Sequence, residues 1–446
     1  MKKIVYIFSF FILLMMSNAC NGFLDEKSDS LLAVPETLED NQAILDRTYV
    51  LGLNPTSAEI SADDLYLTES DFNAMPNESE KRLYLWQPDY VSLESGNDWK
   101  NSYTKINIFN NVLFNLDYYN IPDSDNVRGQ ALVFRAAIYL DAAQIWCLAY
   151  DAATADQDLG LPLRIDPDAN IPSVRATLRE TYNQILTDLH TAIQLLPNQQ
   201  IAASRPSKVT ALGFLSRTYL YMGDYENSLK YGLEALSINK QLMNYNTLNV
   251  NASYPIANLN MEVLLPTSIS YSPFLSVNTA KIPTEIYNLY EENDLRKTIF
   301  FKINSNGEVL FRGNYGGSST RKNCLAIDEI YLNVSESYAQ LNNPAKATFW
   351  LNTLLETRWK TGTYTPLDIK DNTELLLKIQ EERRKELLFR GLRWADIKRY
   401  NKAGAQISLT RTVNGKIYNL PPNDLRFAIA IPEDIIEMTG MPQNPR

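Results

Sequence analysis

Apolar residues recur at helical spacing in several long stretches of this chain, and polar stretches rich in Asn, Ser, Asp and Pro separate them. A helix is expected from Thr37 to Leu51, and helical periodicity returns from Trp99 to Leu116 and in the ranges 127–242 and 325–400. Residues three and four apart lie on one face of a helix, so each stretch predicts a helix with one buried face. The pattern therefore predicts a mainly α-helical protein.

Three of the helical stretches share a small residue that is followed, three positions later, by a tyrosine. These pairs are Ala136 and Tyr139, Ser216 and Tyr219, and Ser335 and Tyr338. A turn and a second helix follow, although the second helix of the first pair comes later, at 177–197. A small side chain lets two helices approach closely, and the aromatic ring fills the space beside it. The spacing resembles tetratricopeptide repeats, in which each hairpin buries its face by stacking on the next. A fourth hairpin is expected over 374–400.

Two long polar ranges interrupt this helical pattern. Residues 52–98 are interpreted as irregular loops, and residues 243–322 as a second insertion, in which 262–269 and 306–314 each predict a short strand or hairpin. Loops of this length in a compact protein usually carry function. We therefore expect ligand contacts in these two insertions and a structural role for the helical hairpins.

The densest charged stretch, residues 381–401, contains seven cations and four carboxylates. Three pairs are expected within the stretch, because their members lie three or four positions apart. They are Glu381 with Lys385, Glu386 with Arg390, and Arg393 with Asp396. Gly391 is expected to break or bend the helix, or to let another backbone approach. The stretch is therefore interpreted as part of the scaffold and not as a phosphate site.

The N-terminus predicts export. Two lysines precede an apolar run from Ile4 to Met16, which is shorter than the ~20 residues of a membrane span but fits a secretory signal. Ala19 then precedes Cys20, as in a bacterial lipobox, although Ser17 stands where such a box usually has Leu. We interpret residues 1–19 as a signal peptide and Cys20 as the acylated residue. The alternative is an ordinary secreted protein with an unmodified cysteine.

Composition and motifs favour a binding protein over an enzyme. The net charge of −10 disfavours general nucleic-acid binding. His190 is the single histidine and lies on a predicted amphipathic helix, and no nucleotide-binding, metalloprotease or hydrolase motif occurs. Cys147 and Cys324 lie in apolar surroundings and are expected to be buried free thiols. The alternative is a single disulfide between them. No catalytic residue, metal or cofactor is predicted; a glycosidase with two dispersed carboxylates is the enzyme alternative.

Several motifs, in order along nearly the whole chain, resemble the SusD/RagB family of Bacteroidota surface lipoproteins. They are FLDE after Cys20, DWKNSYTKINIFNNVL, VRGQALVFRAAIYLDAAQIW leading to GLPL, SRPSKVTALGFLSRTYLYMGDY, EERRKELLFRGLRWADIKRY and the ending AIPEDIIEMTGMPQNPR. The resemblance implies a SusD-like α-α superhelix with a few short β-hairpins. It also implies an outer-membrane, lipid-anchored protein that faces the cell exterior as the lid of a SusC-like, TonB-dependent transporter. Glycans are the usual cargo in the family, and some relatives take peptides. The chain is shorter than many members.

The family places its ligand on loops from the two insertions, but no motif identifies the contacting residues. A glycan surface combines exposed aromatic faces with polar side chains. The candidates in the first insertion are Arg82, Tyr84, Trp86, Asp89, Tyr90 and Asn97; those in the second are Tyr271, Tyr315 and Arg321. Trp86 is the first choice, because it lies in a stretch that is interpreted as a polar loop.

These observations predict a tether over 20–36 and a single domain over 37–446, with scaffold at 127–242 and 325–400. The leading hypothesis is a non-catalytic nutrient-binding lipoprotein that captures an oligosaccharide. Two alternatives keep the same partner: a peptide as cargo, or a pure scaffold for the transporter that binds no ligand of its own.

Overall fold

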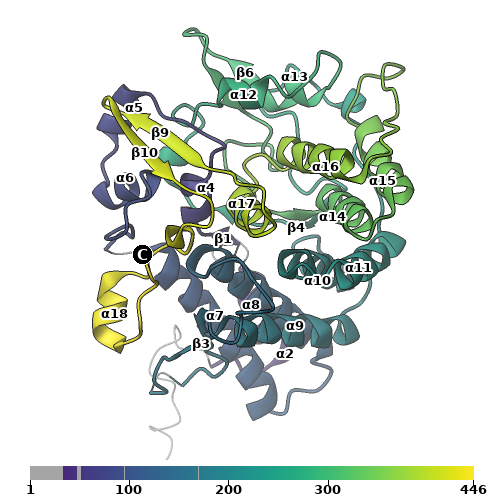
Figure 1. Ribbon diagram of the computed structural model, residues 1–446. Coiled ribbons are helices and arrows are strands. Elements are labelled where there is room, and N and C mark those ends of the chain that lie inside the picture. The colour runs from purple at the N-terminus through teal and green to yellow at the C-terminus, as the bar shows by residue number, and fades with distance from the viewer. Residues whose placement is uncertain (1–33, 48–51, 95, 169) are drawn as a thin grey trace, which may run out of the picture.

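A row of helices forms the body of the protein. The computed structural model describes residues 34–47, 52–94, 96–168 and 170–446. Each helix of the row packs against the next, and in Figure 1 the row rises from α2 and α7 through α10 and α11 to α15 and α16. Its members are α2 (Leu38–Leu45), α7 (Asp98–Tyr118), α8 (Asp125–Trp146), α9 (Leu178–Leu195), α10 (Lys208–Met222), α11 (Tyr225–Ile238), α14 (Ile327–Gln340), α15 (Pro344–Glu356) and α16 (Asn372–Glu386). The predicted mainly helical fold is confirmed.

Small residues bring the paired helices together, as the spacing predicted. The Ser216 hydroxyl on α10 donates to the Ser228 carbonyl on α11 at 3.0 Å, and the Ser335 hydroxyl on α14 donates to the Ala347 carbonyl on α15 at 2.8 Å. A Cβ added at Gly232 would lie 2.7 Å from a Val334 methyl carbon, so a larger residue there would push α11 away from α14. These contacts explain why each hairpin stacks closely on the next.

The fourth predicted hairpin is not a stacked pair. Helix α16 packs against α14, whereas α17 (Arg393–Lys402) packs against α8 and against α4 (Ser57–Ser61). Gly391 lies between α16 and α17 with a φ of +73°, a conformation that glycine adopts without strain. The turn at Gly391 therefore redirects the chain, and α17 joins the scaffold to the first insertion.

The first insertion is more ordered than its composition suggests. Three short helices lie within residues 52–98, so the interpretation as irregular loops is wrong over these ranges: α4, α5 (Glu69–Ala74) and α6 (Glu78–Tyr84). The Thr68 hydroxyl caps α5 by accepting the Asp71 N–H at 3.1 Å. Such helices are too short to show a clear period of apolar residues, which explains why the pattern did not predict them.

Short strands pair the insertions with one another and with the scaffold. The paired strands are β1 (Leu53–Asn54) with β5 (Ser268–Ile269), β2 (Leu159–Pro162) with β3 (Arg175–Thr177), β4 (Val263–Leu265) with β8 (Leu325–Ala326), β6 (Phe301–Ile303) with β7 (Val309–Phe311), and β9 (Leu409–Val413) with β10 (Lys416–Leu420). The second insertion contains strands in both ranges where they were expected, β4 and β5 within 262–269 and β7 within 306–314, together with short helices. The remaining helices are η1 (Tyr245–Thr247), η2 (Pro273–Leu275), α12 (Thr284–Tyr287), α13 (Arg296–Phe300), η3 (Leu425–Phe427) and α18 (Glu433–Thr439).

The two cysteines of the described ranges are buried free thiols, as predicted. Burial raises the pKa of Cys147 and of Cys324, which disfavours the reactive thiolate. Within the described residues, every helix is too short or too polar to cross a membrane. The predicted signal peptide and the acylated Cys20 lie outside the described residues.

Candidate functional site

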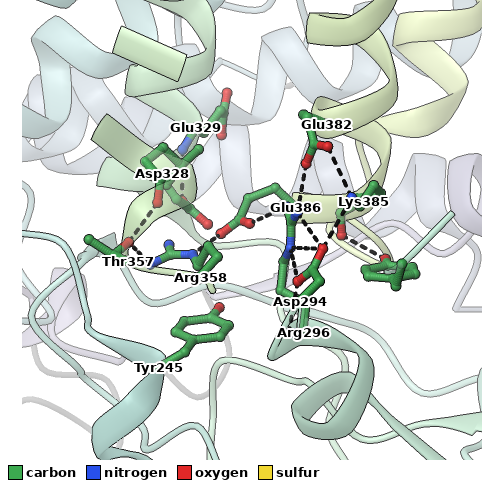
Figure 2. A network of polar contacts seen from close by, with 12 residues as sticks. Tyr245, Asp294, Arg296, Asp328, Glu329, Thr357, Arg358, Glu382, Lys385 and Glu386 are labelled. Atoms are coloured by element: carbon green, nitrogen blue, oxygen red, sulfur yellow. Dashed lines mark hydrogen bonds and ion pairs between the residues drawn. The ribbon is translucent and has the colours of Figure 1, made fainter. Parts of the chain in front are cut away.

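The charged stretch is the centre of a buried ion-pair network (Figure 2). The Arg296 side chain is fully buried, and its guanidinium contacts Asp294 at 2.7 Å, Glu382 at 2.6 Å and Glu386 at 3.0 Å. Arg358 contacts Glu386 at 2.8 Å and also binds Glu262. Charges of α16 therefore pair with cations far away in the sequence, and they join the second insertion to the scaffold.

The local pairs expected within this stretch are wrong. Arg390 binds Asp328 at 3.1 Å, Arg393 binds Asp63 at 2.7 Å, and Glu381 binds Lys378 at 2.6 Å. Helix α16 ends at Glu386, so the helical spacing that would bring Glu386 to Arg390 does not exist. Burial then favours partners from other elements, because a buried charge needs a close and well-oriented counter-charge. The interpretation as scaffold stands, although some of the pairs that make it are long-range and the local ones, such as Arg399 with Asp396 at 2.8 Å, are not those expected.

Perturbed acids in this network are out of reach of a ligand. Burial raises the pKa of Glu262 to about 7, although Arg358 opposes this shift. Burial acts in the same direction on Glu382, yet the charges of Arg296 and Lys385 outweigh it and hold the pKa of Glu382 well below its ordinary value. Glu262 and Glu382 are 0% and 2% exposed. Their shifts therefore reflect a structural network and not an open acid–base centre.

A cleft of about 340 Å³ lies where the two insertions meet strand β9. Its walls come from the segment after α4, the end of α6, the start of α12 and β9. The lining residues are Asp63, Leu65, Tyr66, Leu67, Tyr84, Trp86, Pro283, Thr284, Glu285, Leu409, Thr410, Arg411 and Thr412. Tyr66 is 39% exposed and presents an aromatic face beside threonine hydroxyls and carboxylates. This combination suits a ligand with both apolar faces and hydroxyl groups.

Arg411 of β9 organises the floor of the cleft. Its guanidinium carbon lies 3.6 Å from the Tyr84 ring centroid and 4.6 Å from that of Trp86. The guanidinium donates to the carbonyls of Ile60 at 3.0 Å, of Ala62 at 2.5 Å, and of Tyr84. Burial lowers the pKa of Arg411 to about 10. Arg411 therefore fixes the end of α4 and two aromatic rings in one arrangement.

The two aromatic candidates in this floor are buried. Trp86 is 4% exposed, its Nε1–H donates to the Ser61 carbonyl at 2.9 Å, and its φ is +52°. The Tyr84 hydroxyl accepts the Leu67 N–H at 3.0 Å. The expectation that Trp86 lies open in a polar loop is wrong, because Arg411 covers its ring. Tyr84 and Trp86 support the cleft from below, and a direct contact with ligand stays a prediction.

The other first-insertion candidates lie in a neighbouring cluster or at a helix end. Arg82 donates to the Asp89 carbonyl at 2.7 Å and lies over the ring of Tyr90, which is 64% exposed. Asp89 also pairs with the C-terminal Arg446. Asn97 caps α7 by accepting the Lys100 N–H at 2.8 Å, which is a structural role.

The second-insertion candidates do not come together either. The buried Tyr315 hydroxyl lies within hydrogen-bond distance of Glu262 at 2.9 Å and of Asp328 at 3.0 Å, so it belongs to the ion-pair network. Arg321 is also buried and stacks on the ring of Phe389 at 4.0 Å. Tyr271 alone among the three is open, at 85% exposure. Of the nine candidates, only Tyr84 and Trp86 line the cleft.

The sequence interpretation missed Tyr66 and Arg411, which complete the cleft. One signal could have placed Arg411: Asn414 and Gly415 follow it, and this dipeptide is a strong hairpin signal. Both residues adopt positive φ, 51° and 71°, in the turn between β9 and β10. The same hairpin orients Arg411 into the molecule, since Leu409, Arg411 and Val413 alternate as buried positions along β9.

Two family models and one named relative match this chain. A family model described as "Starch-binding associating with outer membrane" matches residues 22–220, and one described as "SusD family" matches residues 315–432. A protein named "SusD-like protein P2", from Formosa agariphila, is 24% identical over 414 residues, which are 78% of this chain and 79% of that protein.

Solved structures share the fold. The crystal structure of a SusD superfamily protein from Bacteroides thetaiotaomicron superimposes with a TM-score of 0.75 at 20% identity, covering 92% of this chain and 100% of that one. A putative sugar binding protein from Bacteroides vulgatus gives a TM-score of 0.74 at 19% identity, covering 93% and 99%.

Proposed function

We propose, from the premise that this chain belongs to the SusD/RagB family, that it is a non-catalytic nutrient-binding lipoprotein of the outer membrane. In this proposal residues 1–19 are removed, Cys20 carries the lipid anchor, and residues 37–446 form one domain that faces the cell exterior. The domain captures an oligosaccharide and closes a SusC-like, TonB-dependent transporter as its lid. A "putative sugar binding" name on a structural relative supports the class of ligand.

The observation that carries the proposal is the cleft at the meeting point of the two insertions. Tyr66 offers a ring at its rim, and Thr284, Thr410 and Glu285 offer groups that can bind sugar hydroxyls. Although burial raises it, the charges of Arg393 and Arg384 hold the pKa of the lining Asp63 carboxyl well below its ordinary value. Asp63 is therefore already paired within the fold, and the open groups of the cleft are suited to recognition.

The test is a screen of the purified protein against glycan and peptide arrays, followed by titration calorimetry with the best ligand. We expect Tyr66→Ala to weaken binding roughly five- to thirtyfold, because stacking of a sugar on an aromatic ring contributes about 1–2 kcal/mol. Tyr271→Ala is the matched control, since Tyr271 is an exposed tyrosine that does not line the cleft.

The outcomes separate the alternatives. Loss of binding in the Tyr271 variant alone would move the site out of the cleft, to the open part of the second insertion. Binding of peptides and not of glycans would change the cargo and leave the site in place. The absence of any ligand, together with co-purification of a transporter, would favour the pure scaffold.

A further inference from the structure

A small chamber lies beside Gly391, apart from the cleft. Its volume is about 20 Å³, and its walls come from α8, α10, the turn before α17 and the segment that leads into β8. The polar groups in its lining belong to Asp141, Gln144, Arg217, Tyr221 and Asn323. Such a volume holds about one water molecule, because a single water requires roughly 10–15 Å³ measured in this way.

Two polar atoms of this lining are buried without a protein partner among the described residues. They are the Tyr221 hydroxyl and the Asn323 side-chain oxygen. Tyr221 itself is 4% exposed. A buried hydroxyl or amide oxygen without a hydrogen bond costs free energy, and buried polar groups that lack a protein partner usually bind ordered water.

The other polar groups of the chamber are partly used. One Asp141 oxygen accepts the Asn54 side-chain amide at 3.0 Å, while the Arg217 guanidinium donates Nε and one terminal nitrogen to Glu329 at 2.7 and 2.5 Å. Asp141 can therefore accept a further hydrogen bond. The guanidinium charge of Arg217 in the same wall disfavours a metal cation, and the single carboxylate in the wall disfavours an anion.

We propose that the chamber binds one fixed water molecule that bridges Tyr221, Asn323 and Asp141. The water joins α8 and α10 to Asn323, the point at which the second insertion returns to the scaffold. Gly391 makes room for this arrangement, since a Cβ at that position would lie 3.3 Å from the Asn323 Cβ. This water therefore links the second insertion to the helical scaffold.

A crystal structure of the protein near 1.5 Å resolution, grown in a rubidium bromide solution, tests the proposal directly. We expect one peak of water density within hydrogen-bond distance of the Tyr221 hydroxyl and the Asn323 oxygen, with no anomalous signal. An empty chamber would overturn the proposal, and so would an anomalous peak from rubidium or bromide.

Tyr221→Phe provides a second measurement that depends on the water. If water satisfies the hydroxyl, its removal should lower Tm by roughly 1–2 °C in a chain of this size. If the chamber is empty, the hydroxyl is unsatisfied and its removal should not lower Tm. Tyr290→Phe is the matched control, because the buried Tyr290 hydroxyl donates directly to the Lys385 carbonyl at 2.9 Å and its loss should lower Tm in either case.

Discussion

The ion-pair network and the cleft use the same kinds of side chain for different ends. In the network Arg296 binds three carboxylates, and all three belong to side chains of the same chain. In the cleft Arg411 binds backbone carbonyls and aromatic rings, and the ring of Tyr66 remains open. The comparison teaches that the dense charge pattern belongs to the scaffold, whereas the proposed binding site lies where polar and aromatic groups can still accept contacts from a ligand.

The largest effect is expected when a charge is removed from the network. Glu386→Ala leaves Arg296 and Arg358 each short of one carboxylate in a fully buried position. We expect the free energy of unfolding to fall by about 3–5 kcal/mol, the usual cost of breaking a buried pair. Chemical denaturation monitored by circular dichroism measures it.

The control for Glu386 is an exposed pair. Lys370 and Asp368 are 81% and 78% exposed, and Lys370→Ala should leave the denaturation midpoint unchanged. An unchanged free energy of unfolding in Glu386→Ala would show that the network does not stabilise the scaffold. If the remaining folded Glu386→Ala protein also lost ligand affinity, the separation between scaffold and cleft would be wrong.

A smaller effect is expected from the floor of the cleft. Arg411→Met keeps much of the side-chain length but leaves the carbonyls of Ile60, Ala62 and Tyr84 without their donor. We expect the free energy of unfolding to fall by about 1–3 kcal/mol, with weaker ligand binding in the folded protein. Arg426→Met is the control, since Arg426 reaches the Trp86 carbonyl at 3.1 Å without lining the cleft. Unchanged stability and affinity in the Arg411 variant would refute its role.

How far the sequence predicts the molecule depends on how local each feature is. The hairpin helices follow from residues a few positions apart, such as Ser216 and Tyr219, and three of the four expected hairpins form. The exposure of Trp86 depends on Arg411, which comes from a distant strand, so no local pattern could indicate that the ring is covered. The partners of Glu386 were missed for the same reason: Arg296 and Arg358 reach it only through the fold.

The last prediction concerns Glu59, which connects the two regions. Glu59 lies on α4, the helix that supports the cleft, and its carboxyl accepts the Gly391 N–H at 2.8 Å beside the charged stretch. Burial, with help from Asp64, raises the pKa of Glu59 to about 8, although the Gly391 N–H and Arg321 oppose the shift. Between its ordinary value of 4.5 and about 8, the folded protein keeps a proton that the unfolded chain releases. The contribution of Glu59 to stability therefore falls as the pH rises through this window, by at most ~1.4 kcal/mol per pH unit.

Glu59→Gln removes this titration while keeping the shape of the side chain. We expect the stability of the wild type relative to the variant to decline from about pH 5 to pH 8, as measured by denaturant titration at each pH. Glu285→Gln is the control, because Glu285 is exposed at the rim of the cleft and its replacement should leave the pH profile as it is. Parallel profiles for the wild type and the Glu59 variant would mean that this carboxyl is ionised in the fold. Arg321 would then balance its charge, and the Gly391 N–H would donate to an ionised carboxylate and not to a neutral carboxyl.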